Sequence, residues 1–461
     1  MKLLLLAAVA SVSAIQLAER SSAVLQLDTN RRSIASPATR DRQRLRKRTV
    51  QQVLDNESAL YYANITLGTP AQKLRLDIDT GSSDIWCNSA VSSLCQQEQD
   101  QCDESGTFNA NKSSSYQYVN SAFYIRYADG SAAAGDYAKD TLHFGGQDIT
   151  GVQFGIGYQS SSAQGILGVG YPINEASIGT TGEAYTNLPA LLVQKKLINT
   201  AAYSLWLNDL DANTGSILFG GVDTAKYQGD LQTLPIIKES GTYREFVIAL
   251  SSISAAGQTI LNDNPIPVLL DSGSSLSYLP NSLAQAIFTV FDATFDQRAG
   301  VAVVDCSLRN SGKTVDFVFS GVKISVGLDE LVIIEEVRRG REICILGISN
   351  ADDSTAVLGD TFLRSAYVVY DLSNNQISLA PTDFNATESS VKEIASGSSG
   401  VPGAKLVATA VSTLAVASGG ARGVGGPTVT ALNAAAAPTA ANIGKVAAVV
   451  AAGAAGMAMV L

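Results

Sequence analysis

The chain has 461 residues, enough for two or three domains, with 46% apolar residues, only 16% charged residues and 40 glycines. This composition favours a β-rich secreted protein over a helical cytosolic one. The net charge of −10 argues against nucleic acid as a partner, and a single histidine, His143, excludes a metal site built from several histidines.

The first 48 residues have the composition of two processing segments. Residues 1–14 combine a lysine, an apolar run and the small-residue end Val12-Ser13-Ala14, which predicts a secretory signal peptide. Residues 15–48 hold nine Lys and Arg against three Asp and Glu and end in Arg46-Lys47-Arg48. We interpret them as a basic propeptide removed by a dibasic-specific convertase, able to lie over an anionic cleft as a plug. A disordered basic linker is the alternative.

Short strands and turns fill residues 49 to 384. Residues 61–67 and 74–78 alternate apolar and polar side chains, as half-buried strands do, around a Gly68-Thr69-Pro70 turn. His143 ends another strand at a turn, where a structural or surface role is expected. The remaining elements are strands at 216–219 and 367–370, a hairpin at Asn374-Asn375, and a helix over 282–291 capped by Asn281 or Ser282.

Five cysteines in a secreted chain should form pairs and leave one over. Cys306 and Cys344 stand alone in the second half, so we expect them to be joined. Cys95 and Cys102 can close a short loop, which would leave Cys87 odd. The sequence also permits Cys87 to pair with either of those two.

One pattern occurs twice and organises the chain. An apolar strand leads to Asp79-Thr80-Gly81-Ser82-Ser83, and another leads to Asp271-Ser272-Gly273-Ser274-Ser275. Because one carboxylate behind an apolar strand is costly to desolvate alone, we expect Asp79 and Asp271 to face each other and share a proton.

The same repeat extends beyond the two turns. An apolar pair followed by Gly168 ends 89 residues after Asp79, and one followed by Gly359 ends 88 residues after Asp271. The matched distances predict two related lobes.

Two carboxylates at hydrogen-bond distance hold one proton over a range of acid pH. The ionised member can take a proton from a bound water while the protonated member donates to a carbonyl oxygen. Water then attacks an amide without a covalent intermediate. Gly81 and Gly273 would allow the close approach, and the hydroxyls that can satisfy the carboxylates or brace the turns belong to Thr80, Ser82, Ser272 and Ser274.

These motifs resemble the pepsin-type aspartic proteases, over about residues 61–381. The resemblance implies an all-β, bilobal fold of two barrel-like lobes, an N-lobe of about 49–232 and a C-lobe of about 233–384, with a substrate cleft between them. It also implies a flap hairpin. Residues 125–131 match that hairpin, which places Tyr127 over the cleft, Asp129 and Gly130 at the flap tip, and Trp86 as the partner of Tyr127. Ser272 replaces the commoner threonine and keeps its hydroxyl.

Specificity is a separate hypothesis. Asp129 and the acidic residues of the Cys95 loop, Glu98, Asp100, Asp103 and Glu104, would admit Lys or Arg near the cut. A solvated acidic loop is the competing explanation.

The composition changes after Asn385, where small residues and almost no aromatic residues predict a flexible stalk over 385–433. Small residues at Asn433-Ala434-Ala435, a spacer and an apolar tail predict a GPI-anchor signal over 434–461, with Asn433 as the attachment site. A weak membrane-spanning helix is the alternative. N-glycosylation sequons stand at Asn56, Asn64, Asn111 and Asn385, Asn64 being the less favourable because it lies in an expected strand.

The layout is similar to that of fungal yapsins and related cell-surface proteases. It implies a monomeric, extracellular aspartic endopeptidase at the cell membrane or wall, which cuts peptide or protein substrates at acid pH with no cofactor and no metal. The competing hypothesis is a catalytically silent pepsin-fold protein with a binding or wall-structural role.

Overall fold

The computed structural model describes residues 23–32, 60–96, 101–127, 130–212, 214–352 and 354–416, all within one compact unit. The expected signal peptide, the dibasic site at Arg46-Lys47-Arg48, Asn56, Glu98, Asp100, Asp129, Asn433 and the expected GPI signal lie outside these residues.

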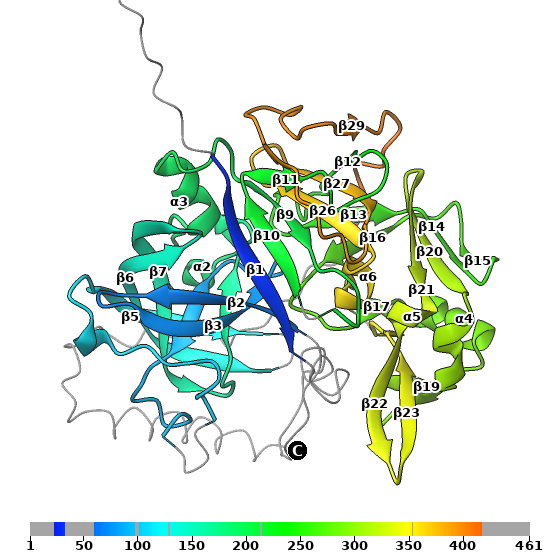
Figure 1. The fold of residues 1–461 in the computed structure, drawn as a ribbon, viewed down its shortest axis with the longest axis horizontal. Coiled ribbons are helices and arrows are strands. Elements are labelled where there is room, and N and C mark those ends of the chain that lie inside the picture. The colour runs from blue at the N-terminus through cyan, green and yellow to red at the C-terminus, as the bar shows by residue number, and fades with distance from the viewer. Residues whose placement is uncertain are drawn as a thin grey trace, which may run out of the picture. The chain divides into compact units, whose positions relative to one another are not determined.

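One large sheet joins the two halves of the chain (Figure 1). Its strand order is β29-β12-β27-β26-β9-β10-β1-β2-β3-β8-β4-β7-β6-β5. Antiparallel pairing of β26 with β9, such as Val368 opposite Leu205, makes the connection between the halves. The strands are β1 (Leu25–Arg32), β2 (Leu60–Leu67), β3 (Gln72–Asp79), β4 (Ile85–Asn88), β5 (Gln117–Arg126), β6 (Ala132–Phe144), β7 (Gln147–Ser160), β8 (Gly165–Gly168), β9 (Ala202–Trp206), β10 (Thr214–Phe219), β12 (Gln232–Pro235), β26 (Ala366–Asp371), β27 (Gln376–Pro381) and β29 (Lys405–Leu406).

The second half adds three smaller sheets, ordered β13-β16-β25-β17-β24, β15-β14-β20-β21 and β18-β19-β23-β22, and β11 pairs with β28. Their strands are β11 (Gly221–Asp223), β13 (Val247–Leu250), β14 (Ser252–Ala255), β15 (Gln258–Leu261), β16 (Ile266–Leu270), β17 (Ser277–Leu279), β18 (Thr294–Asp296), β19 (Val301–Val304), β20 (Thr314–Phe319), β21 (Val322–Gly327), β22 (Val332–Arg338), β23 (Arg341–Leu346), β24 (Ile348–Asn350), β25 (Ala356–Leu358) and β28 (Val391–Glu393).

Within the described residues, helices are few and short. Helix α4 (Asn281–Val290) agrees with the expected helix, but its N-cap residue is Pro280 and carries no side-chain cap bond, so the expected cap at Asn281 or Ser282 was wrong. The other helices are α2 (Ala176–Thr181), α3 (Leu188–Gln194), α5 (Leu328–Leu331), α6 (Asp360–Leu363) and the 3₁₀ turns η1 (Ala110–Lys112), η2 (Pro172–Asn174) and η3 (Cys306–Asn310).

The internal repeat has a structural counterpart in each half. Strand β3 pairs in parallel with β8, which sets Asp79 opposite Gly168. Strand β16 pairs in parallel with β25, and the N–H of Asp271 donates to the carbonyl of Leu358 at 3.1 Å. The mainly β, two-lobed fold is therefore confirmed.

Strand β1 comes from the expected propeptide and is an internal strand of the sheet, paired with β10 on one side and β2 on the other. Leu25 and Leu27 are buried at alternating positions. The high charge of residues 15–48 obscured this alternation, so part of the expected basic propeptide contributes to the core.

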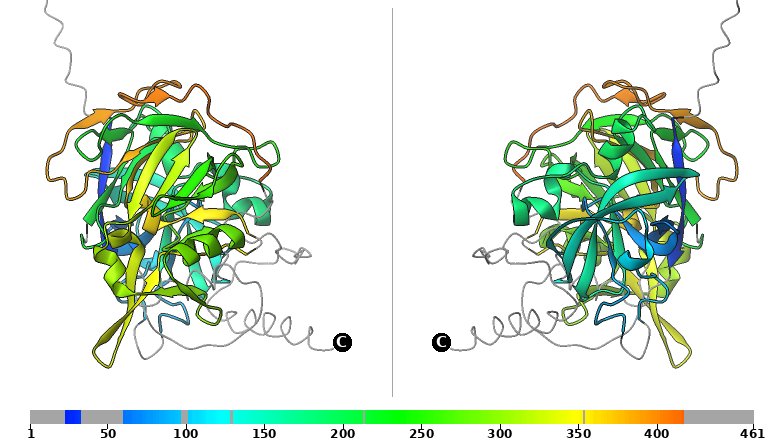
Figure 2. Two further views of the ribbon diagram at one scale, coloured as in Figure 1. Left: turned by 90° about the vertical axis from the view of Figure 1, so that its right-hand side faces the viewer. Right: turned by 90° about the vertical axis from the view of Figure 1, so that its left-hand side faces the viewer.

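Residues 385–416 also differ from expectation, because they pack on the domain instead of beginning a flexible stalk (Figure 2, orange). Strand β28 pairs with β11, and β29 pairs with β12. Ile394 is fully buried beside Trp206 and Tyr367. Composition missed this segment because backbone pairing and a few apolar side chains are sufficient to attach it.

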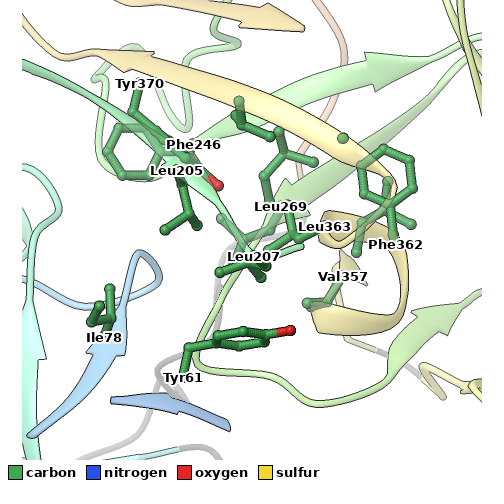
Figure 3. Close-up of a cluster of buried hydrophobic side chains, with 14 of the residues drawn as sticks. Tyr61, Ile78, Leu205, Leu207, Phe246, Leu269, Val357, Phe362, Leu363 and Tyr370 are labelled. Atoms are coloured by element: carbon green, nitrogen blue, oxygen red, sulfur yellow. The ribbon is translucent and has the colours of Figure 1, made fainter. Parts of the chain in front are cut away.

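The main hydrophobic core is continuous across both halves. Figure 3 shows Tyr61 and Ile78 of the first half around the same core as Phe246 and Leu269 of the second. The two carboxylate turns thus rest on one shared apolar support.

The disulfides Cys306–Cys344 and Cys95–Cys102 are present, and Cys87 is a buried free thiol whose pKa is raised by burial. Asn64, Asn111 and Asn385 are exposed. No helix within the described ranges is long and apolar enough to cross a membrane.

Candidate active site

Strands β3 and β16 deliver two carboxylates to one buried place. Asp79 ends β3 and is 3% exposed, and Asp271 follows β16 and is 2% exposed. The strand residues behind them, such as Ile78 and Leu270, are fully buried. The apolar strands therefore fix both backbones and set the two carboxylates at the polar turns that follow them.

The inner oxygens of the two carboxylates share one donor. The N–H of Gly81 donates to Oδ1 of Asp79 at 2.9 Å and to Oδ1 of Asp271 at 3.1 Å. Since one hydrogen cannot bridge distant acceptors, these two Oδ1 atoms lie close together. The N–H of Gly273 donates to Oδ1 of Asp271 at 2.9 Å.

Each outer oxygen has its own hydroxyl donor. Ser82 Oγ donates to Oδ2 of Asp79 at 2.5 Å, and Ser274 Oγ donates to Oδ2 of Asp271 at 2.7 Å. These bonds hold the outer oxygens, so the inner oxygens of both carboxylates remain turned toward each other.

Glycine is required at the third position of both turns. A Cβ atom on Gly81 would lie 2.6 Å from Oδ1 of Asp271, and one on Gly273 would overlap Oδ1 of Asp79. Each glycine therefore faces the carboxylate of the opposite turn, as the sequence suggested.

Thr80 and Ser272 brace the turns against each other. Thr80 Oγ1 donates to the carbonyl of Leu270 at 2.9 Å and accepts from the N–H of Ser272 at 3.0 Å. Ser272 Oγ donates to the carbonyl of Ile78 at 2.9 Å and accepts from the N–H of Thr80 at 3.2 Å. The reciprocal pattern ties one lobe to the other at the carboxylate pair.

Strands β5 and β6 form the hairpin that matches a flap. Tyr127 follows β5, and its hydroxyl accepts from Trp86 Nε1 at 2.7 Å. Its N–H donates to the carbonyl of Ser131 at 2.9 Å, and Gly130 takes a φ of +83°, which favours glycine. A small apolar cluster supports this base and is called the flap-base cluster: Trp86, Phe123, Ile125, Tyr127, Ala133, Tyr137 and Ile166.

Two of the acidic residues near the Cys95–Cys102 disulfide lie away from the carboxylate pair. Asp103 and Glu104 line an open cavity of about 860 Å³, together with Lys73 and Arg75 of β3 and with His143. None of the paired carboxylate turns lines this cavity. The two acidic residues therefore share this cavity with two cationic side chains.

His143 lies near the end of β6. Its Nδ1 is 2.7 Å from Oδ1 of Asp148, and its Nε2 is 2.9 Å from the carbonyl oxygen of Gly68. The carboxylate and this carbonyl raise the pKa of His143 above its ordinary value. The contacts fit the structural or surface role expected for it.

One buried carboxylate near the site was missed by sequence reasoning. Asp84 is fully buried and accepts hydrogen bonds from the hydroxyls of Tyr137 and Tyr185 and from the N–H of Ala176. Its position directly after Ser82-Ser83 was the available signal. The partners are distant in sequence and could not be identified from it.

Comparison with known proteins gives a consistent result. Residues 60–382 match the family described as eukaryotic aspartyl protease. The chain is 53% identical over 417 residues to the Aspergillus oryzae protein named "Probable aspartic-type endopeptidase opsB", covering 88% of this chain and 85% of that protein. It is 41% identical to secreted aspartic protease 3 of Candida albicans, over 74% of this chain and 84% of the relative. It is 35% identical to barrierpepsin of Saccharomyces cerevisiae, over 77% of this chain and 66% of the relative.

Proposed function

Because the chain belongs to the pepsin family of aspartic proteases and is an aspartic-type endopeptidase, we propose that Asp79 and Asp271 activate the water that hydrolyses its peptide substrates. The observation that carries this proposal is the Gly81 N–H, which donates to Oδ1 of both carboxylates. Two carboxylates so close resist double ionisation, so the pair holds one proton at acid pH.

The reaction follows from that shared proton. A water bound between the inner oxygens loses a proton to the ionised carboxylate, its oxygen attacks the carbonyl carbon of the scissile amide, and the protonated carboxylate gives its proton to the carbonyl oxygen. The resulting tetrahedral diol collapses when the carboxyl that took the water proton gives it to the amide nitrogen. The C–N bond then breaks, the amine leaves, and one diol hydroxyl returns its proton to the other carboxylate as the carboxylic acid product forms. Ser82 and Ser274 keep the outer oxygens occupied, which reserves Oδ1 of Asp79 and Asp271 for water and substrate.

The flap completes the site in this proposal. Tyr127 would cover the substrate, and Trp86 would hold its hydroxyl in place through the 2.7 Å bond. A covered site excludes water from the developing charges and so strengthens the electrostatic contribution of the carboxylates. Asp129 and Gly130 would form the tip above the substrate.

Residues 15–48 act, in this proposal, as a propeptide that a dibasic-specific convertase removes after Arg48. Strand β1 is paired with β10 and β2, so cleavage after Arg48 has two possible results for this strand. It either leaves the sheet with the rest of the propeptide or remains bound in the sheet after cleavage. The inhibitory plug would then consist of the basic residues after β1, while β1 itself belongs to the sheet.

A signal peptide at 1–14, a stalk and a GPI anchor at Asn433 would place the enzyme outside the cell, at the membrane or in the wall. The packing of residues 385–416 shortens the proposed stalk to the residues that follow. Asn64 and Asn111 are exposed acceptors for glycans, and Asn56 is a further acceptor by sequence. Asn385 is exposed as well, but a glycan on its amide nitrogen would replace the bond to Asp209. The enzyme would act as a monomer.

The most specific part of the proposal is that the enzyme accepts Lys or Arg near the scissile bond. It depends on Asp129, Glu98 and Asp100, since Asp103 and Glu104 line a separate cavity together with Lys73 and Arg75. Asp129→Ser should lower kcat/KM for peptides with a basic residue near the cut and leave apolar peptides unaffected. If the variant treats basic residues as the wild type does, this part of the proposal is wrong.

The catalytic proposal is tested with the mature protein, freed of its propeptide. It should hydrolyse a protein substrate at acid pH, pepstatin should block the reaction, and Asp79→Asn should abolish it. No hydrolysis between about pH 3 and about pH 6 in the fully processed protein would contradict the proposal.

A further inference from the structure

We propose that Asp84 is a positioning residue that couples the Asp79 turn to the flap and to the wall beside it. It stands five residues after Asp79 and two before Trp86 in the chain. It is fully buried, in a place where a carboxylate is stable only with several donors around it. The structure supplies three donors, from two separate segments of the chain.

The first donor is on the flap strand. Tyr137 belongs to β6, the returning strand of the flap hairpin, and its hydroxyl donates to Oδ1 of Asp84 at 2.8 Å. Tyr137 is fully buried in the flap-base cluster, and its ring meets Phe123 of β5 edge-on at 5.2 Å. A shift of Asp84 would therefore reach both strands that carry Tyr127.

The second and third donors come from the segment after η2. Tyr185 donates its hydroxyl to Oδ1 of Asp84 at 3.2 Å, and the N–H of Ala176, at the start of α2, donates to Oδ2 at 2.7 Å. The Tyr185 ring meets Tyr137 edge-on at 5.7 Å. Burial and the charge of Asp84 raise the pKa of Tyr185, so its phenol remains a neutral donor.

Residues 174–185 are also held by a bond within the segment and by a bond to the Asp79 turn. Glu175 accepts from the N–H of Tyr185 at 2.6 Å, and Asn174 donates its amide to the carbonyl of Gly81 at 3.5 Å. Residues 174–185 thus contact the Asp79 turn at Gly81 and again at Asp84. One carboxylate holds this segment and the flap strand in a fixed relation to the catalytic turn.

The role is positional because these three bonds lead to Tyr137, Tyr185 and Ala176 rather than to the reacting pair. An amide in place of the carboxylate cannot satisfy all three donors, because one of its two polar atoms is itself a donor. The segments would then settle farther apart, and the substrate would bind in a less complementary channel. Loss of uniform binding raises KM and leaves kcat nearly unchanged.

The test compares Asp84→Asn with a matched buried carboxylate. Asp223 of β11 is 4% exposed and also accepts three bonds, from the N–H groups of Ala225 and Ser390 and from the hydroxyl of Ser389. It lies where β11 pairs with β28, among segments that do not carry the catalytic turns. Asp223→Asn should therefore reproduce the general cost of a buried amide without moving the flap.

Both variants are assayed on a peptide substrate, with active sites counted by pepstatin titration. Asp84→Asn should raise KM about ten-fold and change kcat less than about two-fold, and Asp223→Asn should leave KM within about two-fold of the wild type. An unchanged KM in Asp84→Asn, or an equal rise in both variants, would overturn the proposal.

A second pair of variants applies if Asp84→Asn does not fold. Tyr137→Phe and Tyr185→Phe each remove one hydroxyl and retain the ring. Both should raise KM in the same direction with kcat retained, and an unchanged KM in both would refute the role of Asp84.

Discussion

The brace between the lobes gives a quantitative prediction for Thr80→Val. Valine keeps the shape of the side chain and removes Oγ1, which donates to the carbonyl of Leu270 and accepts from the N–H of Ser272. One buried N–H is then left without that acceptor, and one buried carbonyl loses that donor. Such losses sum to about 2–4 kcal/mol of unfolding free energy, a large part of the roughly 5–15 kcal/mol that holds a typical domain folded.

The assay is denaturant unfolding of the mature protein, with midpoints compared at a constant slope. Thr233→Val is the matched control, because Thr233 Oγ1 is also buried but pairs with the hydroxyl of Ser378 and not with the backbone. Its cost should be about 1 kcal/mol. Ser272→Ala removes the reciprocal half of the brace and should cost as much as Thr80→Val.

Activity provides a second readout of the same variants. Thr80→Val should lower kcat about a hundred-fold, because the two carboxylates lose their mutual register. A loss of stability below about 0.5 kcal/mol, or a loss no larger than that of Thr233→Val, would refute the reasoning.

Three further predictions concern other parts of the molecule. Asp148 and, to a lesser extent, the Gly68 carbonyl raise the pKa of His143 above its ordinary 6.5. The protonated imidazole therefore stabilises the fold fully below about pH 6.5, and this stabilisation is lost as pH rises through the pKa of the folded state. The free energy of unfolding of His143→Gln should match that of the wild type at alkaline pH and fall below it at acid pH. Ile394→Ala should cost about 2–5 kcal/mol of unfolding free energy, whereas a change near zero would mean that residues 385–416 do not pack on the domain. Trp86→Phe should lower kcat/KM at least about ten-fold, since Tyr127 loses its donor; unaltered kinetics would contradict the proposed flap contact.

Most of the correct predictions came from patterns that lie within short stretches of the sequence. The turns at Asp79 and Asp271, with their matched distances to Gly168 and Gly359, predicted two related lobes, because a strand, a turn and a parallel partner are encoded within short stretches. The structure places Gly168 opposite Asp79 and pairs β16 with β25 as that repeat requires.

The failures arose where tertiary contacts decided the outcome. Strand β1 was hidden because charge dominates residues 15–48, although Leu25 and Leu27 alternate. Residues 385–416 were expected to be a flexible stalk because they have few apolar side chains of their own. Their composition does not reveal that Trp206 and Tyr367, elsewhere in the chain, provide an apolar surface on which they pack. Asp84 could not be distinguished from a solvated acidic residue, since its donors lie 53, 92 and 101 residues away in the chain.

The proton-sharing pair is tested most directly by kcat/KM of Asp79→Asn, Asp271→Asn and the double variant on one peptide at acid pH. If the carboxylates act as a unit, each single variant loses about 10⁴-fold or more, and the double variant is no worse than either one. Retention of activity within about ten-fold of the wild type in either single variant, or losses that multiply in the double variant, would contradict the account.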